Sequence, residues 1–398
     1  MADFLVNTTT RDFQFQPFAA AQLGTAYAVV WADGSDASIK GQLLAADGSR
    51  IAGEFTVNAP TPTDGGTRRA WPAFAFSGSN TFAVWVELPS AAPPPAPGVK
   101  LQRFFDGQRQ GPESRVNTSD IDPRTRPALT RTTDGGCMVV WLGGRPDRRV
   151  LARRFDAEGE AVGPEFVVNT VAGEHTAAAA ALLSDGNHVV AWNAAAGERL
   201  TLRFLDSAAD TPRAGEISPN LASFGGRGAL APLDDGRFVL AHLSRMRDSD
   251  LGEMQSTVVA SVFDADGAEV AAVPAGEPRG VTRSSPAVAA LPQGRFLLGW
   301  VERSAVSADA VPAVRAQLCS VGGGALGEPV AVSTARDGVR FQLCAATACE
   351  GDGAQSALLV WADNSPAPAG DTSAFSVRGR AFGISAAGNN FELVRKMT

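Results

Sequence analysis

The stretch from Pro286 to Trp300, PAVAALPQGRFLLGW, decides the fold. It holds a run of small residues, a turn at Gly294 and a second apolar run that ends in Trp300. Two other stretches of 15 residues, 17–31 and 127–141, also begin with Pro and end with Trp. Short apolar runs separated by Gly turns predict paired strands, so we expect the chain to be built from copies of one β unit.

The aromatic residue that ends the second run recurs along the whole chain. It falls at Trp31, Trp85, Trp141, Trp192, His242, Trp300 and Trp361, with intervals of 50 to 61 residues. Each copy offers four short strands, and seven four-stranded units of this period predict an all-β, seven-bladed β-propeller of antiparallel blades. The expected blades, in a single domain over 1–398, are 17–58, 72–117, 127–169, 177–218, 228–274, 286–333 and 341–394. The periodic aromatic residues are interpreted as packing between blades.

An additional outer-strand sequence precedes the first copy. DFLVNTT (3–9) is like the outer-strand ends EFTVN (54–58) and EFVVN (165–169). We therefore predict that residues 3–8 complete the seventh blade and close the ring, because an open edge strand invites aggregation. The segment 391–394 is left as a fifth strand, a tail, or a strand lent to another subunit.

These motifs support a resemblance. DFLVNTT, PALTR (127–131), CMVVW (137–141), VLARRFDAEG (150–159) and EFVVN follow a pattern that resembles the repeat of bacterial secreted and surface proteins, often calcium-binding and RTX-related. The plan is also similar to that of seven-bladed bacterial lectins. The resemblance implies an extracellular or cell-surface protein, with the cytoplasm as the alternative. His242 in place of Trp, the insertion ACEGDGA and the absence of calcium nonapeptides depart from that pattern.

Composition excludes several classes of partner. The net charge is −7 and no run of Lys or Arg occurs, which argues against nucleic-acid binding. No apolar run reaches the roughly 18 residues that span a bilayer. The start, MADFLVNTTT, lacks the basic and apolar regions of a conventional signal peptide. We expect a glycan or another protein as partner, and self-association through the termini is a further option.

Loop lengths indicate which face binds. The loops after the second strand of the blades are long and irregular, and long loops on a rigid face commonly carry function. These loops are 88–98, 143–149, 244–255, 303–313 and 363–376. On the same face we expect an acidic arc and, just before the first strands, a second set of residues. The candidate ligand-binding residues are Asp33, Glu87, Glu302, Asp363, Trp71, Arg126, Arg227 and Arg340.

Two interpretations of these residues stay open. The acidic and arginine arcs could hold a cation, a sugar or an acidic polymer, or each carboxylate could pair with a neighbouring arginine and hold the blades together. Trp71 lies outside the core pattern, and could stack on a sugar ring or pack a turn. The turns at Asp156 and Asp264 leave calcium open, although Asp-Gly is also a standard hairpin turn. No other cofactor is expected.

Three functions are compatible with this sequence. The first is a non-enzymatic, lectin-like binding or surface scaffold protein that acts through the long-loop face. The alternatives are a propeller-type hydrolase or lyase with a site at the channel mouth, and a structural subunit that self-assembles. No GxSxG, HExxH, P-loop or dinucleotide motif is present, which ranks the enzyme below the binder. A lectin predicts equivalent pockets in several blades, whereas an enzyme predicts one asymmetric pocket with converging titratable groups.

Overall fold

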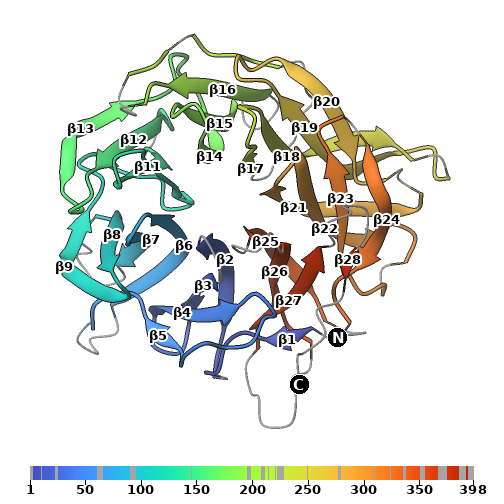
Figure 1. Ribbon diagram of the computed structural model, residues 1–398, viewed down its shortest axis with the longest axis horizontal. Coiled ribbons are helices and arrows are strands. Elements are labelled where there is room, and N and C mark those ends of the chain that lie inside the picture. Colours follow the sequence, from blue (N-terminus) through green and yellow to red (C-terminus); the bar gives the residue numbers. More distant parts are fainter. Residues whose placement is uncertain are drawn as a thin grey trace.

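Seven antiparallel sheets surround a central channel in the computed structural model (Figure 1). The structure describes all residues except 1–2, 10, 23–25, 61–65, 90–95, 145, 195–198, 208–210, 214, 220, 222–227, 249, 277–278, 308, 323, 335–337, 350–354, 366–373, 385–390 and 393–398. The predicted seven-bladed β-propeller is confirmed.

Each blade runs from an inner strand beside the channel to an outer strand at the rim. Blade one is β2 (Gln14–Gln22), β3 (Ala26–Asp33), β4 (Ser38–Ala45) and β5 (Phe55–Thr56), and blade two is β6 (Thr67–Ser77), β7 (Asn80–Pro89), β8 (Gly98–Phe105) and β9 (Gln108–Arg115). Blade three is β10 (Ala128–Arg131), β11 (Cys137–Leu142), β12 (Val150–Phe155) and β13 (Ala161–Val167). Blade four has β14 (Thr176–Leu182), β15 (His188–Ala194) and β16 (Arg199–Leu205), with Ile217 and Pro212 bridging to β16 at the outer position.

The remaining blades complete the circle. Blade five is β17 (Ala229–Pro232), β18 (Phe238–Arg247), β19 (Met254–Phe263) and β20 (Glu269–Pro274), and blade six is β21 (Val281–Leu291), β22 (Arg295–Ser304), β23 (Ala313–Ser320) and β24 (Ala325–Ala331). Blade seven is β25 (Arg340–Cys349), β26 (Gln355–Asp363) and β27 (Ser376–Ile384), whose outer edge pairs with both β1 (Phe4–Leu5) and β28 (Phe391–Glu392).

Both ends of the described chain close the ring. Phe4 pairs with Gly379 at one part of β27, and Phe391 pairs with Ile384 at another. The outer strand of blade seven is therefore a composite of two short pieces. The residues before blade one complete blade seven, as predicted.

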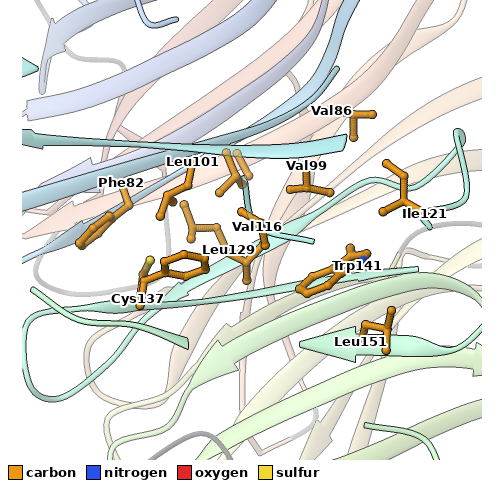
Figure 2. Close-up of a cluster of buried hydrophobic side chains, with 14 residues drawn as sticks. Phe82, Val86, Val99, Leu101, Val116, Ile121, Leu129, Cys137, Trp141 and Leu151 are labelled. Atoms are coloured by element: carbon orange, nitrogen blue, oxygen red, sulfur yellow. The ribbon is translucent and has the colours of Figure 1, made fainter. Parts of the chain in front are cut away.

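The recurring tryptophans are core residues. All six are at most 1% exposed, and Trp141 of blade three lies in one buried cluster with Val99 and Leu101 of blade two (Figure 2). His242 takes the corresponding place in blade five, where it is buried and its Nε2 lies 3.0 Å from the Ser261 hydroxyl. Because one blade covers the face of the next, these side chains bury apolar surface that no single sheet could bury.

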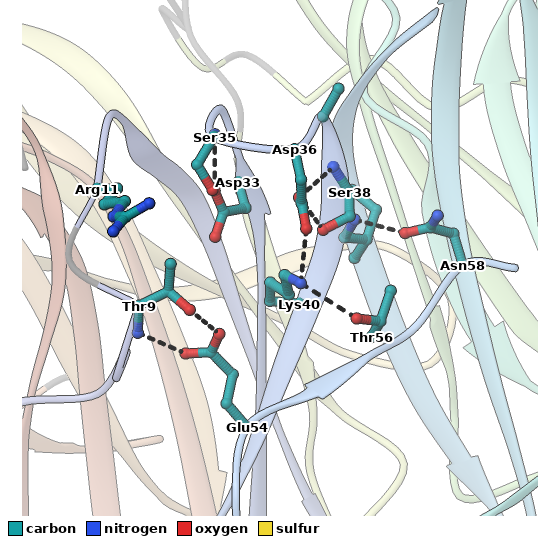
Figure 3. Close-up of polar contacts among 12 residues, drawn as sticks. Thr9, Arg11, Asp33, Ser35, Asp36, Ser38, Lys40, Glu54, Thr56 and Asn58 are labelled. Atoms are coloured by element: carbon teal, nitrogen blue, oxygen red, sulfur yellow. Dashed lines mark hydrogen bonds and ion pairs between the residues drawn. The ribbon is translucent and has the colours of Figure 1, made fainter. Parts of the chain in front are cut away.

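The outer-strand motif is a clasp between neighbouring blades. The Glu54 carboxylate accepts hydrogen bonds from Thr9 N (3.2 Å) and Thr9 Oγ1 (2.6 Å), so blade one holds the segment that follows β1 of blade seven (Figure 3). Glu113, Glu165 and Glu216 accept backbone N–H groups of the preceding blade in the same way. The Asn of the motif also closes its own blade, since Asn58 Oδ1 accepts from Ile39 N at 2.7 Å. The Glu and Asn of the motif thus have packing roles within this chain, and the relation to secreted repeats stays a prediction.

Replacing a clasp glutamate is expected to loosen the ring. Glu165 accepts from Thr118 N (2.7 Å) and Ser119 N (3.0 Å), so Glu165→Ala should lower the free energy of unfolding by about 1–2 kcal/mol in urea denaturation. Glu158→Ala, in an exposed turn, is the control and should change the free energy of unfolding little.

The stabilisation by Glu165 depends on pH. Burial opposes the charged form of Glu165, but the hydrogen bonds from Ser119 and Thr118 outweigh this effect and lower its pKa. The contribution of Glu165 to the free energy of unfolding is present above its unfolded pKa and is lost as pH falls through its folded pKa.

Candidate functional site

A cavity of about 730 Å³ opens on blades seven, one and two, beside the central channel of about 940 Å³. Its aromatic walls are Phe13, Phe15, Trp71, Phe341 and Phe375, and its polar lining includes Asp12, Asp33, Arg68, Gln16 and Gln342. We call this cavity the blade-one pocket. Trp71, Gln16, Phe341 and Gln342 also line the channel, so the two spaces share a wall. The pocket lies where β3 and β26 end, on the face of the loops after the second strands.

Bulges in the inner strands shape this wall. The register of the first strand shifts in blades one, two, four, six and seven, and each shift contains one residue with positive φ. A bulge re-aims side chains and often lies beside a functional site. Nine described residues other than Gly have positive φ, and five of them line the blade-one pocket: Asp12, Gln16, Ala37, Trp71 and Gln342. Strained backbone is concentrated at this pocket, as it commonly is at binding and catalytic sites.

A chain of hydrogen bonds links the bulges of three blades. Gln342 Oε1 accepts from Gln16 N at 2.8 Å, and Gln16 Oε1 accepts from Trp71 N at 2.6 Å. The Arg126 guanidinium then lies 3.8 Å from the centre of the Trp71 ring. The structure thus brings two predicted residues, Trp71 and Arg126, into contact, and Trp71 is half-buried with Arg126 over its ring.

Three of the predicted acidic residues form ion pairs inside their own blades. Each lies directly opposite an arginine of the first strand: Glu87 opposite Arg69 (3.1 Å), Glu302 opposite Arg283 (3.1 Å) and Asp363 opposite Arg340 (3.2 Å). The ion-pair interpretation therefore describes the contacts of Glu87, Glu302, Asp363 and Arg340. Arg227 lies outside the described residues.

Asp33 breaks this pattern. The residue opposite it on β2 is Gln14 rather than arginine, and both side chains are almost fully buried. Asp33 Oδ1 accepts from Ser35 N (2.8 Å) and Ser35 Oγ (2.5 Å), whereas Oδ2 has no hydrogen-bond partner among the described residues (Figure 3). Burial raises the pKa of Asp33 more than the bonds from Ser35 lower it, and Asp36 raises it further. Burial therefore shifts Asp33 towards its neutral form relative to a solvated aspartate.

A second carboxyl group lines the same pocket. Asp12 is exposed and has a φ of 60°, and its carbonyl accepts from Ala374 N at 3.1 Å. One buried and one solvated carboxyl in a single cavity is the arrangement by which enzymes separate acid and base roles. Asp12 and Gln14 were not among the residues predicted from the sequence. Aligning the copies on the Pro that begins the first apolar run would have shown the difference, since Gln14 lies three residues before Pro17 just as Arg69 and Arg283 lie three before Pro72 and Pro286.

The Asp-rich turns have the contacts of hairpin turns. Asp264 Oδ1 accepts from Asp266 N (3.0 Å) and Ala268 N (2.8 Å), and Asp156 Oδ1 accepts from Glu158 N and Glu160 N. Among the residues that the structure describes, no three His, Cys, Asp or Glu side chains gather into a metal-binding group. Calcium binding stays a prediction. The described residues also contain no helix that is long and apolar enough to cross a membrane.

Comparison with known proteins supports the fold. No family model matches the chain, and no curated protein matches it. Among solved structures, an ulvan lyase of polysaccharide lyase family 25 has a TM-score of 0.55 at 10% identity, over 94% of each chain. A protein of unknown function from Dyadobacter fermentans gives 0.49 at 12% identity, over 80% of this chain and 95% of that one. A Penicillium chrysogenum α-L-arabinanase gives 0.47 at 12%, over 78% and 93%. At these identities the likeness shows the propeller fold alone.

Proposed function

We propose that this propeller is a glycan-acting enzyme, a hydrolase or lyase, with its site in the blade-one pocket. The observation that carries the proposal is Asp33, a buried carboxyl group that has no guanidinium partner among the described residues, in a cavity walled by aromatic rings. Aromatic faces suit the apolar faces of sugar rings, and a protonated carboxyl suits a leaving glycosidic oxygen. The ulvan lyase has the same fold and acts on a polysaccharide, which is compatible with this proposal.

The two carboxyl groups divide the work in hydrolysis. The glycosidic C–O bond breaks as its oxygen takes the proton of Asp33. Asp12 takes a proton from water, whose hydroxide part adds to the anomeric carbon. In a lyase, Asp33 protonates the same leaving oxygen while a base removes the proton from the carbon beside a carboxylate. A double bond then forms in the product.

A second candidate is lectin-like glycan binding without turnover. Five aromatic side chains line the pocket, and that alone would serve binding. The ion pairs of Glu87, Glu302 and Asp363 favour a single site over several equivalent ones, because the carboxylates of those blades are already neutralised. A secreted or surface location and self-association through the termini stay predictions.

Product analysis separates these functions. The purified chain would be incubated with neutral and acidic polysaccharides, and reducing ends and the ultraviolet absorbance of unsaturated sugars would be measured. Reducing ends alone indicate hydrolysis, and both signals together indicate a lyase. Retention in affinity electrophoresis without products would favour the binder. Products formed equally by the wild type and Asp33→Asn would contradict the assignment of Asp33.

A further inference from the structure

The carboxamides of the blade-one pocket have a fixed orientation. Because Gln16 Oε1 and Gln342 Oε1 both accept backbone N–H groups, the amino group of each side chain is directed away from those contacts. Neither Nε2 has a hydrogen-bond partner within the described residues. Both residues line the pocket and the channel, so their amino groups are donors available to a ligand.

Arg68 adds a charged donor to the same lining. Its guanidinium lies 5.5 Å from the centre of the Phe15 ring, and none of the ion pairs among the described residues involves it. The neighbouring Arg69, by contrast, is paired with Glu87 and also donates to Ala37 O at 3.0 Å. Arg68 therefore has its charge available at the wall, with one side of the guanidinium supported by an aromatic ring.

Two carboxyl groups also line the pocket. Asp33 is almost fully buried, so Asp12, which is exposed, is the acidic side chain that an anionic ligand would have to avoid. A ligand that presents several acceptor oxygens would satisfy Arg68 and the two carboxamides together, and charge-assisted bonds to a guanidinium are the strongest of these contacts.

We propose that the blade-one pocket recognises an anionic group, a carboxylate or a sulfate, on its glycan. This inference rests on the proposed function and names its substrate class. The guanidinium of Arg68 would take two of the anion's oxygens, and the amino groups of Gln16 and Gln342 would donate to the sugar or to the anion. The protein as a whole carries a charge of −7, so this recognition depends on local donors rather than on net charge.

Matched polysaccharides test the inference. Polygalacturonate would be compared with its methyl ester, and dextran sulfate with dextran, in affinity electrophoresis at several salt concentrations. The charged member of at least one pair should be retained at least about ten-fold more strongly, and which pair responds distinguishes carboxylate from sulfate. Equal retention within both pairs would overturn the inference.

Three variants locate the effect. Arg68→Gln should weaken retention of the charged member about ten-fold or more, and Gln16→Glu should do the same because it keeps the acceptor for Trp71 N and replaces the donor with a negative oxygen. Arg149→Gln is the control, since it removes the same charge from an exposed ion pair in blade three. If Arg68→Gln behaved like Arg149→Gln, the inference would be wrong. Equal binding and cleavage of neutral glycans would overturn it while leaving the proposed function intact, whereas no binding to any probe would contradict both.

Discussion

Asp33→Asn is expected to lower glycan turnover about 10²- to 10⁴-fold, which is the usual contribution of a general acid. The substitution keeps the acceptor that Ser35 needs, and it removes the only proton that Oδ2 could transfer. Binding of the glycan should be nearly unchanged, so the loss should fall on kcat rather than KM. Steady-state kinetics on a polysaccharide that the wild type cleaves would measure this. A variant with wild-type kcat would remove Asp33 from the mechanism.

Gln14→Arg tests the same residue from the opposite strand. It would give Asp33 the partner that Glu87, Glu302 and Asp363 already have, and a guanidinium lowers the pKa of a neighbouring carboxyl. Because the acid form is active, the fall of kcat with rising pH should move to lower pH. Gln14→Leu, which adds no charge, is the control, and it should not move the fall of kcat to lower pH. Carboxyl ¹³C NMR of Asp33 would follow the pKa without any substrate.

The stability of the protein should also depend on the ionisation of Asp33. The pKa of Asp33 is raised above its unfolded value of 3.8, so its contribution to the free energy of unfolding is complete below 3.8 and is lost as pH rises through the folded pKa. Urea denaturation at several pH values should show this loss in the wild type and not in Asp33→Asn. The clasp glutamate Glu165 has the opposite sign, since its pKa is lowered.

Asp363→Ala is expected to cause the largest loss of stability, about 3–5 kcal/mol. Asp363 Oδ2 lies 3.2 Å from Arg340 Nε and accepts from Trp361 Nε1 at 2.9 Å, and the side chains of both ion-pair partners are completely buried. Removing the carboxylate would leave the positive charge of Arg340 in the core without its counterion. Thermal and urea denaturation would measure the loss.

A matched control separates burial from charge. Asp36 pairs with Lys40 at 2.8 Å, but its side chain is 49% exposed, so Asp36→Ala should cost less than about 1 kcal/mol. Comparable losses in both variants would mean that the pair of Asp363 gains nothing from its burial, and would contradict the structural role assigned to it.

The ring could be predicted from sequence because its signals are local and repeated. A small-residue inner strand, a Gly turn and a strand ending in Trp recur with one period, and each feature has a direct physical reason to be where it is. Closure by residues 3–8 followed from the extra copy of the outer-strand motif. His242 occupies the position that Trp has in the other blades, and its Nε2 has a hydrogen-bond partner in the Ser261 hydroxyl.

The site was harder to predict because it depends on register. Whether Glu87 meets Arg69 is decided by which residues lie opposite each other across two strands, and a bulge between them changes the count. Positive φ at Gln16 and Trp71 has no signal in residue type, because most residues avoid that conformation. The pocket lies on the face of the long loops, but it is lined largely by strand ends and bulges.

The shared edge of β27 affects how the protein is made. Phe4 leaves the ribosome before the strands of blade one, yet its partner Gly379 is synthesised only after blades one to six. During translation blades one to six can stack on one another in order, while the strand that precedes them waits for its place in blade seven. A nascent chain that stops before β25, which begins at Arg340, would expose both the waiting segment and the open side of blade six. Such truncated products should be preferred substrates of chaperones and proteases.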